Sequence, residues 1–134
     1  MNSLRLPARL ESLEPFCIFV LEKLNQSHLP PELAPKIELA LEEVLMNIIH
    51  YAYPQGDGDI LLECSVEGQR GFCLRIHDWG SPFNPLTRQA TDISLGITLR
   101  PIGGWGILLV RKMADELNYA RQDDKNVLTL CFRK

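Results

Sequence analysis

The sequence predicts an α+β fold, a two-layer sandwich with three main helices on one face of a mostly antiparallel mixed sheet. Two stretches near the N-terminus place apolar residues at the three- and four-residue spacing of amphipathic helices. A central stretch has the composition of two strands joined by a tight turn. A third helical stretch and one last strand close the chain, and this order does not fit a regular alternation of strands and crossover helices.

The first half of the chain contains one short strand and two helices. Residues 4–8 (LRLPA) have the composition of a short opening strand. Residues 11–26 show helical spacing, with Pro15 in the first turn, where proline is tolerated. A longer helix is expected over residues 28–53, opened by a pair of prolines. Pro35 must lie in its first turn, or the helix starts later.

The second half contains a hairpin, a loop, a helix and a strand. Residues 59–80 predict two strands joined by a tight turn at Gly68–Gly71. Residues 79–104 contain Gly, Pro, Ser and Thr without clear periodicity, and predict a long loop. Loops of this length in a small domain are often functional. A third helix is expected over residues 105–119, followed after a turn by a last strand over residues 126–134.

Composition excludes several classes of function. The 134 residues fit a single domain, and 14 basic against 17 acidic residues give a net charge of −3, which is not typical of nucleic-acid binding. No signal-peptide core or bilayer-length apolar run is present, so no membrane association is expected. Four scattered cysteines predict reduced core thiols and a cytoplasmic protein: Cys17, Cys64, Cys73 and Cys131.

The long helix carries two polar residues where core residues surround them. Glu43 and Asn47 lie four residues apart, so they share one stripe of the helix. Glu38 and Glu42 fall on a different side, where exposure to solvent explains them. Structural alternatives exist for the first pair, because Asn47 could bond a neighbouring loop and Glu43 could pair with Arg75. The pair is therefore a candidate site that needs support from elsewhere in the chain.

That support comes from the two ends of the long loop. At its start, "IHDWGSPFNP" places Asp78 at the end of a strand with Gly80 just after it. At its end, "RPIGGWGILLV" places Gly103, Gly104 and Gly106 before a helix. Glycines there let backbone N–H groups approach a ligand closely, and a helix N-terminus favours an anion. The spacing matches neither a P-loop nor a Rossmann fingerprint. Each end taken alone is equally consistent with turn chemistry or a hinge.

Taken in this order, the three sites resemble the motifs of one superfamily. Glu43–Asn47 resembles the N box, Asp78–Gly80 the first glycine box and Gly104–Gly106 the second glycine box of the GHKL or Bergerat-fold ATPases. Further stretches, such as "ELALEEVLMNIIHYAYP" and "RPIGGWGILLVRKMADE", resemble the bacterial anti-sigma-factor serine/threonine kinases along nearly the whole chain. Trp105 departs from that pattern, because a small aliphatic residue is usual between those glycines.

The resemblance implies a role for each candidate residue with ATP and Mg²⁺ as cofactors. Asn47 would coordinate the metal through its amide oxygen, and Glu43 would accept a proton from the attacking hydroxyl. Asp78 would accept a hydrogen bond from the adenine amino group, and Gly80 would leave room for the base. The residues that would enclose the phosphates are Arg100, Gly103, Gly104 and Gly106.

The resemblance also implies partners. Proteins of that group bind a sigma factor and phosphorylate a serine on an anti-sigma antagonist of STAS fold. Two alternatives remain open: a nucleotide-binding switch module that sequesters a partner without phosphotransfer, or a catalytic ATPase subunit of a histidine-kinase-type phosphorelay. The sequence leaves the oligomeric state open, although an exposed face of the first helix could support a homodimer.

Overall fold

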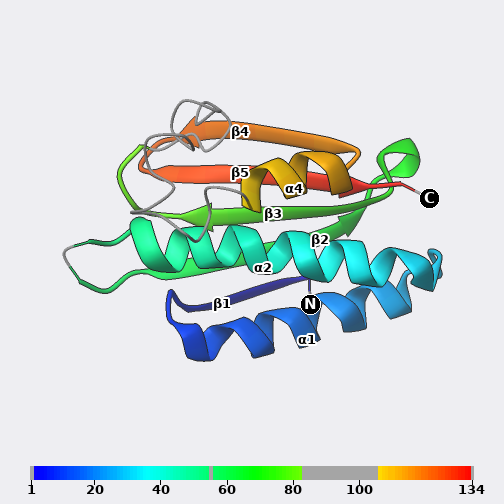
Figure 1. Cartoon of the computed structure of the whole chain (residues 1–134), viewed down its shortest axis with the longest axis horizontal. Coiled ribbons are helices and arrows are strands. Elements are labelled where there is room, and N and C mark those ends of the chain that lie inside the picture. The colour runs from blue at the N-terminus through cyan, green and yellow to red at the C-terminus, as the bar shows by residue number, and fades with distance from the viewer. Residues whose placement is uncertain (1, 55, 83–105, 134) are drawn as a thin grey trace.

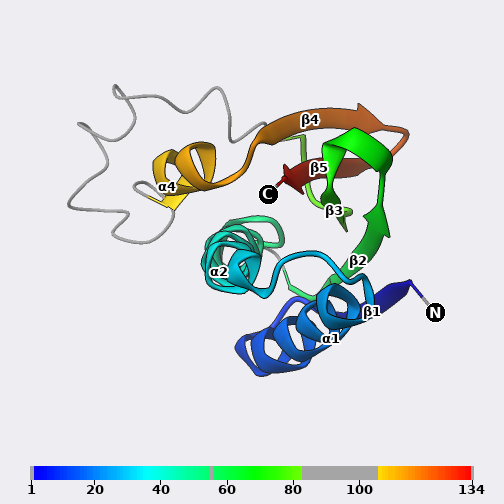
Figure 2. The same ribbon diagram turned by 90° about the vertical axis from the view of Figure 1, so that its right-hand side faces the viewer.

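In the described part of the chain, three α-helices cover one face of a five-stranded sheet (Figure 2). The computed structural model describes residues 2–54, 56–82 and 106–133. Strands are ordered β1-β2-β3-β5-β4, and all four pairings are antiparallel. The two-layer α+β prediction is confirmed, and the sheet of the described residues is wholly antiparallel rather than mixed. No helix in those ranges combines the length and apolar character needed to cross a bilayer.

The first half of the chain has the predicted order of elements, and the second helix begins at Ala34, the later start that Pro35 allowed. Pro15 is the third residue of its helix and Pro35 the second, so both occupy the first turn, where a missing N–H costs no helical bond. A short 3-10 turn precedes each helix. The elements are β1 (Ser3–Pro7), η1 (Leu10–Ser12), α1 (Leu13–Gln26), η2 (Pro31–Leu33) and α2 (Ala34–Tyr51).

The second half confirms the hairpin and corrects the third helix. The elements are β2 (Asp59–Val66), η3 (Gly68–Arg70), β3 (Phe72–Asp78), α4 (Gly106–Met113), β4 (Glu116–Gln122) and β5 (Lys125–Phe132). The helix expected to reach residue 119 ends at Met113. The next segment pairs with β5 along its whole length and directs Leu117 and Tyr119 toward the core. Hydrogen bonds to β5 and the packing of Leu117 and Tyr119 against the core outweigh the local helical pattern.

The core lies between α2 and the sheet. Apolar side chains of α2 meet those of β2, β3 and β5 on the helix-facing side of the sheet. Antiparallel register aligns these side chains in rows across the strands, and most rows are apolar. One row is apolar on its first two strands and polar on the other three: Leu6, Ile60, Asp78, Asn126 and Arg121. This row lies where β3 ends, beside the C-terminal end of α2, at the left of Figure 1.

The outer face of the sheet carries a disulfide and an ion-pair network. Cys73 and Cys131 are paired residues of β3 and β5 and form a disulfide, so the prediction of reduced thiols is wrong for these two. Cys17 and Cys64 are free and buried, as expected. Burial raises the pKa of the Cys64 thiol to about 12. Over the disulfide lies a network of side chains: Glu67, Arg70, Arg75 and Glu116.

Candidate functional site

Asp78 is held at the end of β3 by hydrogen bonds to only one of its carboxylate oxygens. The backbone N–H of Gly80 donates to Oδ1 over 2.9 Å, and Asn126 Nδ2 donates to the same oxygen over 3.0 Å. Within the described residues, Oδ2 receives no hydrogen bond. The side chain is buried, yet one strong acceptor stays available to a ligand.

Burial has an electrostatic effect on this carboxylate. Desolvation raises the pKa of Asp78 above its ordinary value. The hydrogen bonds from Asn126 and Gly80 act in the opposite direction, as do the charges of Arg121 and His77. Carboxylates with a perturbed pKa cluster at functional sites, because a site must desolvate the groups that it uses.

Gly80 is fixed by the backbone of α2. A Cβ at this position would lie 2.5 Å from the carbonyl oxygen of Ala52 and 3.0 Å from its Cβ, so any side chain would push the loop away from the helix. The sequence predicts that Gly80 leaves room for a ligand. The close contact with Ala52 gives a separate reason for glycine, because only a residue without a side chain lets the Asp78 loop pack this closely against the end of α2.

Tyr53, just after α2, contacts both β2 and the loop after β3. The sequence-based prediction missed this residue. Its hydroxyl donates to the carbonyl of Asp59 and accepts from the backbone N–H of Trp79, both over 2.7 Å. Its ring occupies the space that a Cβ of Gly58 would need. Burial raises the pKa of this hydroxyl, so it stays a donor at neutral pH. Tyr53 therefore ties the end of α2 to β2 and to the loop after β3.

Asn126 is the second residue that the sequence-based prediction missed. It is buried, and its Nδ2 also donates to the carbonyl of Ser81 over 3.0 Å. Its Oδ1 accepts from the hydroxyl of Tyr119 over 2.5 Å and from Arg121 Nη1 over 3.3 Å. The strand alternates Asn126 with apolar residues on the core side, so a buried polar residue was detectable in "NVLTLCF". These bonds fix both Asp78 and the residues after Gly80.

Asn47 contains a buried oxygen with no donor. The side chain lies on α2 and is 7% exposed, and its Oδ1 has no hydrogen-bond partner in the described part of the chain. Buried polar atoms are nearly always paired, so an orphaned oxygen indicates a missing partner. An uncharged amide oxygen is a ligand that Mg²⁺ accepts. The residue therefore fits a metal, and the alternative of a bond to a neighbouring loop is not seen among these residues.

Asn47 and the Asp78 loop are close along α2. Ala52, which contacts Gly80, follows Asn47 by five residues, or about 7 Å of helix. Glu43 precedes Asn47 by one turn, so it shares the stripe with Asn47. The proposed partner Arg75 binds Glu67 on the other face of the sheet, over 2.6 Å, and is not bonded to Glu43.

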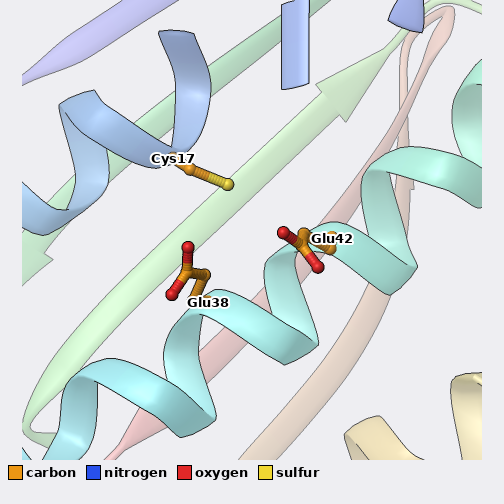
Figure 3. Close-up of side chains that lie close together, drawn as sticks. All are labelled: Cys17, Glu38 and Glu42. Carbon is orange, nitrogen blue, oxygen red and sulfur yellow. The ribbon is translucent and has the colours of Figure 1, made fainter. Parts of the chain in front are cut away.

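Glu38 and Glu42 lie on a different flank of α2 from Glu43, as predicted. That flank is not fully exposed to solvent, because α1 lies beside it. Both carboxylates are directed toward Cys17 of α1 (Figure 3). Helix α2 lies between α1 and α4 (Figure 2). Glu43 lies about 100° around the helix from Glu42, so its stripe is separate from the one that faces Cys17. The two neighbouring acids, Glu42 and Glu43, therefore have separate surroundings.

Two histidines and one tryptophan near these segments make contacts of their own. His77 faces away from Asp78, because its Nε2 bonds Glu63 across the strand pair over 2.7 Å. His50 is exposed and bonds the carbonyl of Met46 over 3.1 Å. Trp79 stacks under the guanidinium of Arg5, 4.3 Å from the ring centre. Gly106 begins α4, as expected. The predicted residues outside the described ranges are Arg100, Gly103, Gly104 and Trp105.

The geometry thus combines two open acceptors at one end of the molecule. Asp78 Oδ2 can accept a hydrogen bond from an N–H group of a heterocycle, and Asn47 Oδ1 can bind a hard cation. Glu43 adds a carboxylate one turn from the cation ligand. Together these groups suit a nucleotide and its metal.

Comparisons with known proteins identify the family of the chain. Residues 6–132 match the family described as the histidine kinase-like ATPase domain. The chain is 28% identical over 94 residues, 70% of its length, to the serine/threonine-protein kinase BtrW of Bordetella bronchiseptica, and spans 66% of that kinase. Its fold is similar to the histidine kinase domain of the blue-light activated histidine kinase from Erythrobacter litoralis EL346, with a TM-score of 0.55, 21% identity and coverage of 77% of this chain and 45% of that one. The chain belongs to the histidine kinase-like ATPase domain family.

Proposed function

We propose that the chain is an ATP-dependent protein serine kinase that regulates a sigma factor by phosphorylating an anti-sigma antagonist of STAS fold. Membership of the family implies ATP as a ligand. The observation that supports the proposal best is the buried, unpaired Oδ1 of Asn47, one helical turn after Glu43. A module that only binds nucleotide has no need of a carboxylate beside its metal ligand.

Asp78 selects the base in this proposal. Its Oδ1 is saturated by Gly80 and Asn126, so Oδ2 is left to accept the adenine amino group. Guanine has a carbonyl oxygen at the corresponding position, which would face the carboxylate and repel it. The preference for ATP over GTP follows from this one oxygen.

Asn47 would hold Mg²⁺, which would neutralise the phosphate charge and orient the γ-phosphate. The amide oxygen adds no charge of its own, so the ion keeps its full attraction for the nucleotide. The buried position of Asn47 keeps that oxygen fixed before the nucleotide arrives. Arg100 would add a second positive charge to the phosphates.

Glu43 would act as the general base. The serine oxygen of the antagonist attacks the γ-phosphorus, and the hydroxyl proton passes to the Glu43 carboxylate. The bond from the γ-phosphorus to the β–γ bridging oxygen breaks, so the products are phosphoserine and ADP. The similarity to a protein named as a serine/threonine kinase supports serine rather than histidine as the acceptor.

The proposal is tested by following the phosphate. Binding partners are captured from the host on the purified full-length chain and incubated with γ-labelled ATP and Mg²⁺. We expect label on a captured protein in an acid-stable form, the behaviour of phosphoserine. Acid-labile label would indicate a histidine phosphorelay. Binding of ATP and a partner without any label would indicate a switch that does not transfer phosphate, and either result would overturn the proposal.

A further inference from the structure

Helices α1 and α2 bring a thiol and two carboxylates together on the flank away from Glu43. Cys17 lies on α1, and Glu38 and Glu42 are one turn apart on α2. The sulfur and one oxygen from each carboxylate all lie within 4.8 Å of one another. Figure 3 shows the three side chains directed into the same space between the helices.

This cluster lacks the positive charge that its carboxylates would normally attract. Within the described residues, neither Glu38 nor Glu42 forms an ion pair with a lysine or an arginine. Like charges four residues apart destabilise a helix. A third acid, Glu14, precedes Cys17 by one turn of α1 and adds to the negative charge around the thiol. The arrangement concentrates negative charge at a place where a bound cation would neutralise it.

The thiol is an independent indication of a ligand. Cys17 is 7% exposed, and its sulfur makes no hydrogen bond to a described residue. Cys17 belongs to the buried core cluster, and its sulfur is directed toward the two partly exposed carboxylates (Figure 3). The other free cysteine, Cys64, is buried without any acidic group acting on it, so the pairing of thiol and acids is specific to Cys17.

We propose that Cys17, Glu38 and Glu42 bind a thiophilic divalent cation of the Zn²⁺ class. One sulfur and two carboxylate oxygens are accepted zinc ligands, and three protein ligands leave the remaining position to water. Ligand atoms around a tetrahedral zinc are about 3.5 Å apart, given metal–ligand distances of about 2.0–2.3 Å. Side-chain rotations that draw the atoms together by about 1 Å reach this geometry. The bound ion would link α1 to α2, the helix that carries Glu43 and Asn47 on another flank.

The test uses the metal-depleted full-length chain titrated with Co²⁺, which reports its ligands by colour. Binding at the proposed site gives a thiolate-to-cobalt charge-transfer band together with tetrahedral d–d absorption, and Zn²⁺ removes both. Cys17→Ser should lose the charge-transfer band, whereas Cys64→Ser should keep it. Glu38→Gln and Glu42→Gln should each weaken Co²⁺ binding about tenfold or more, and Glu22→Gln on the exposed face of α1 should not.

Two results would overturn the proposal. One is the absence of a charge-transfer band at excess Co²⁺, and the other is a band that survives in Cys17→Ser. If Cys17→Ser does not fold, the double variant Glu38→Gln/Glu42→Gln replaces it, because both side chains are partly exposed. Wild-type affinity in that double variant would contradict the site equally. The Mg²⁺ ligand Asn47 carries no sulfur, so binding there cannot imitate the signal.

Discussion

The two oxygens of Asp78 have different tasks. Oδ1 is used by the fold, because it accepts from Gly80 and from Asn126. In the part of the chain that the structure describes, Oδ2 is free to accept a hydrogen bond from the proposed ligand. The two bonds to Oδ1 fix the orientation of the carboxylate. A carboxylate held by fixed donors loses little side-chain freedom on binding, which is the physical advantage of building the network before the nucleotide arrives.

The first prediction concerns base selectivity. ATP should bind more tightly than GTP by on the order of 2 kcal/mol, because guanine replaces an accepted hydrogen bond by a repulsive contact. Asp78→Ala should bind neither nucleotide well. Asp78→Asn offers both an acceptor and a donor, so its preference for ATP should narrow or reverse. Competition calorimetry measures all three, and equal affinity of the wild type for ATP and GTP would refute this role of Asp78.

The second prediction concerns pH. In the proposed function the ionised carboxylate of Asp78 accepts the adenine amino group, and burial raises the pKa of this carboxyl. Its contribution to ATP affinity should be complete above the raised pKa and lost as pH falls through it, at a higher pH than for an ordinary aspartate. The pH dependence of the ratio between wild-type and Asp78→Asn affinities isolates this effect from titration of the nucleotide. A ratio that is constant down to the ordinary aspartate range would contradict it.

The raised pKa of Asp78 affects the stability of the fold in the opposite direction to ATP affinity: a rise in pH favours ATP binding and lowers stability. The native state holds the Asp78 proton more tightly than the unfolded chain, so stability falls as pH rises from the ordinary aspartate pKa through the raised one. At neutral pH, the charged carboxylate of Asp78 therefore lowers the stability of the protein without nucleotide. This cost is the expected signature of a group kept for binding rather than for folding.

The third prediction concerns Asn47 and the metal. Asn47→Ala should weaken ATP binding in the presence of Mg²⁺, on the order of tenfold for the loss of one ligand. In EDTA the variant and the wild type should converge. Removing an oxygen that has no donor also removes an unsatisfied group, so the stability of the fold should change little. Asn25→Ala, an exposed amide on α1, is the control.

An ATP-binding deficit that persists in EDTA would show that Asn47 acts through the structure instead. The metal-binding role proposed for Asn47 follows from the family resemblance, and its spacing from Glu43 only marks the residue as a candidate. The lack of a donor for Oδ1 became visible only in three dimensions, because burial and the neighbouring side chains depend on the whole fold. The roles of Asn126 and Tyr53 were missed because their bonds to Asp78 and to Trp79 join segments far apart in the sequence.

At the scale of elements, the contact between α2 and the loop after β3 decides whether the site forms. Gly80→Ala should destabilise the fold by about 1–3 kcal/mol, because its Cβ would overlap the carbonyl of Ala52. ATP affinity should fall as well, since the N–H of residue 80 donates to Asp78. Ser81→Ala, an exposed neighbour, is the control. Thermal unfolding and calorimetry of both variants check the prediction, and wild-type values for Gly80→Ala would exclude this packing role.

Most elements could be predicted from the sequence because their local signals agree with the fold. Prolines in the first turns, apolar stripes and a glycine turn specify α1, α2 and the hairpin. The exception is Glu116–Gln122, where "ADELNY" continues a helical pattern after α4. Only pairing with β5, which comes later in the chain, decides in favour of a strand. A signal of that kind is not contained in the segment itself.

At the scale of the whole molecule, the sheet serves as a platform with the site at one end. The polar row of Asp78, Asn126 and Arg121 crosses three strands and meets the last turns of α2. Two flanks of α2 carry two different groups of acids, with Glu43 on one and Glu38 and Glu42 on the other. Because Glu42 and Glu43 lie on separate flanks, a substitution of Glu42 can serve as the control for a substitution of Glu43.

The most direct test of the account is the rate of phosphate transfer by Glu43→Gln. A positioned base contributes about 10²–10⁴-fold to rate and little to ground-state binding. The variant should therefore bind Mg-ATP and its partner nearly as well as wild type while losing transfer to the antagonist. Glu42→Gln, assayed in buffer with Mg²⁺ as the sole divalent cation, should transfer at the wild-type rate. Full transfer by Glu43→Gln, or loss of its ATP binding, would contradict the kinase mechanism.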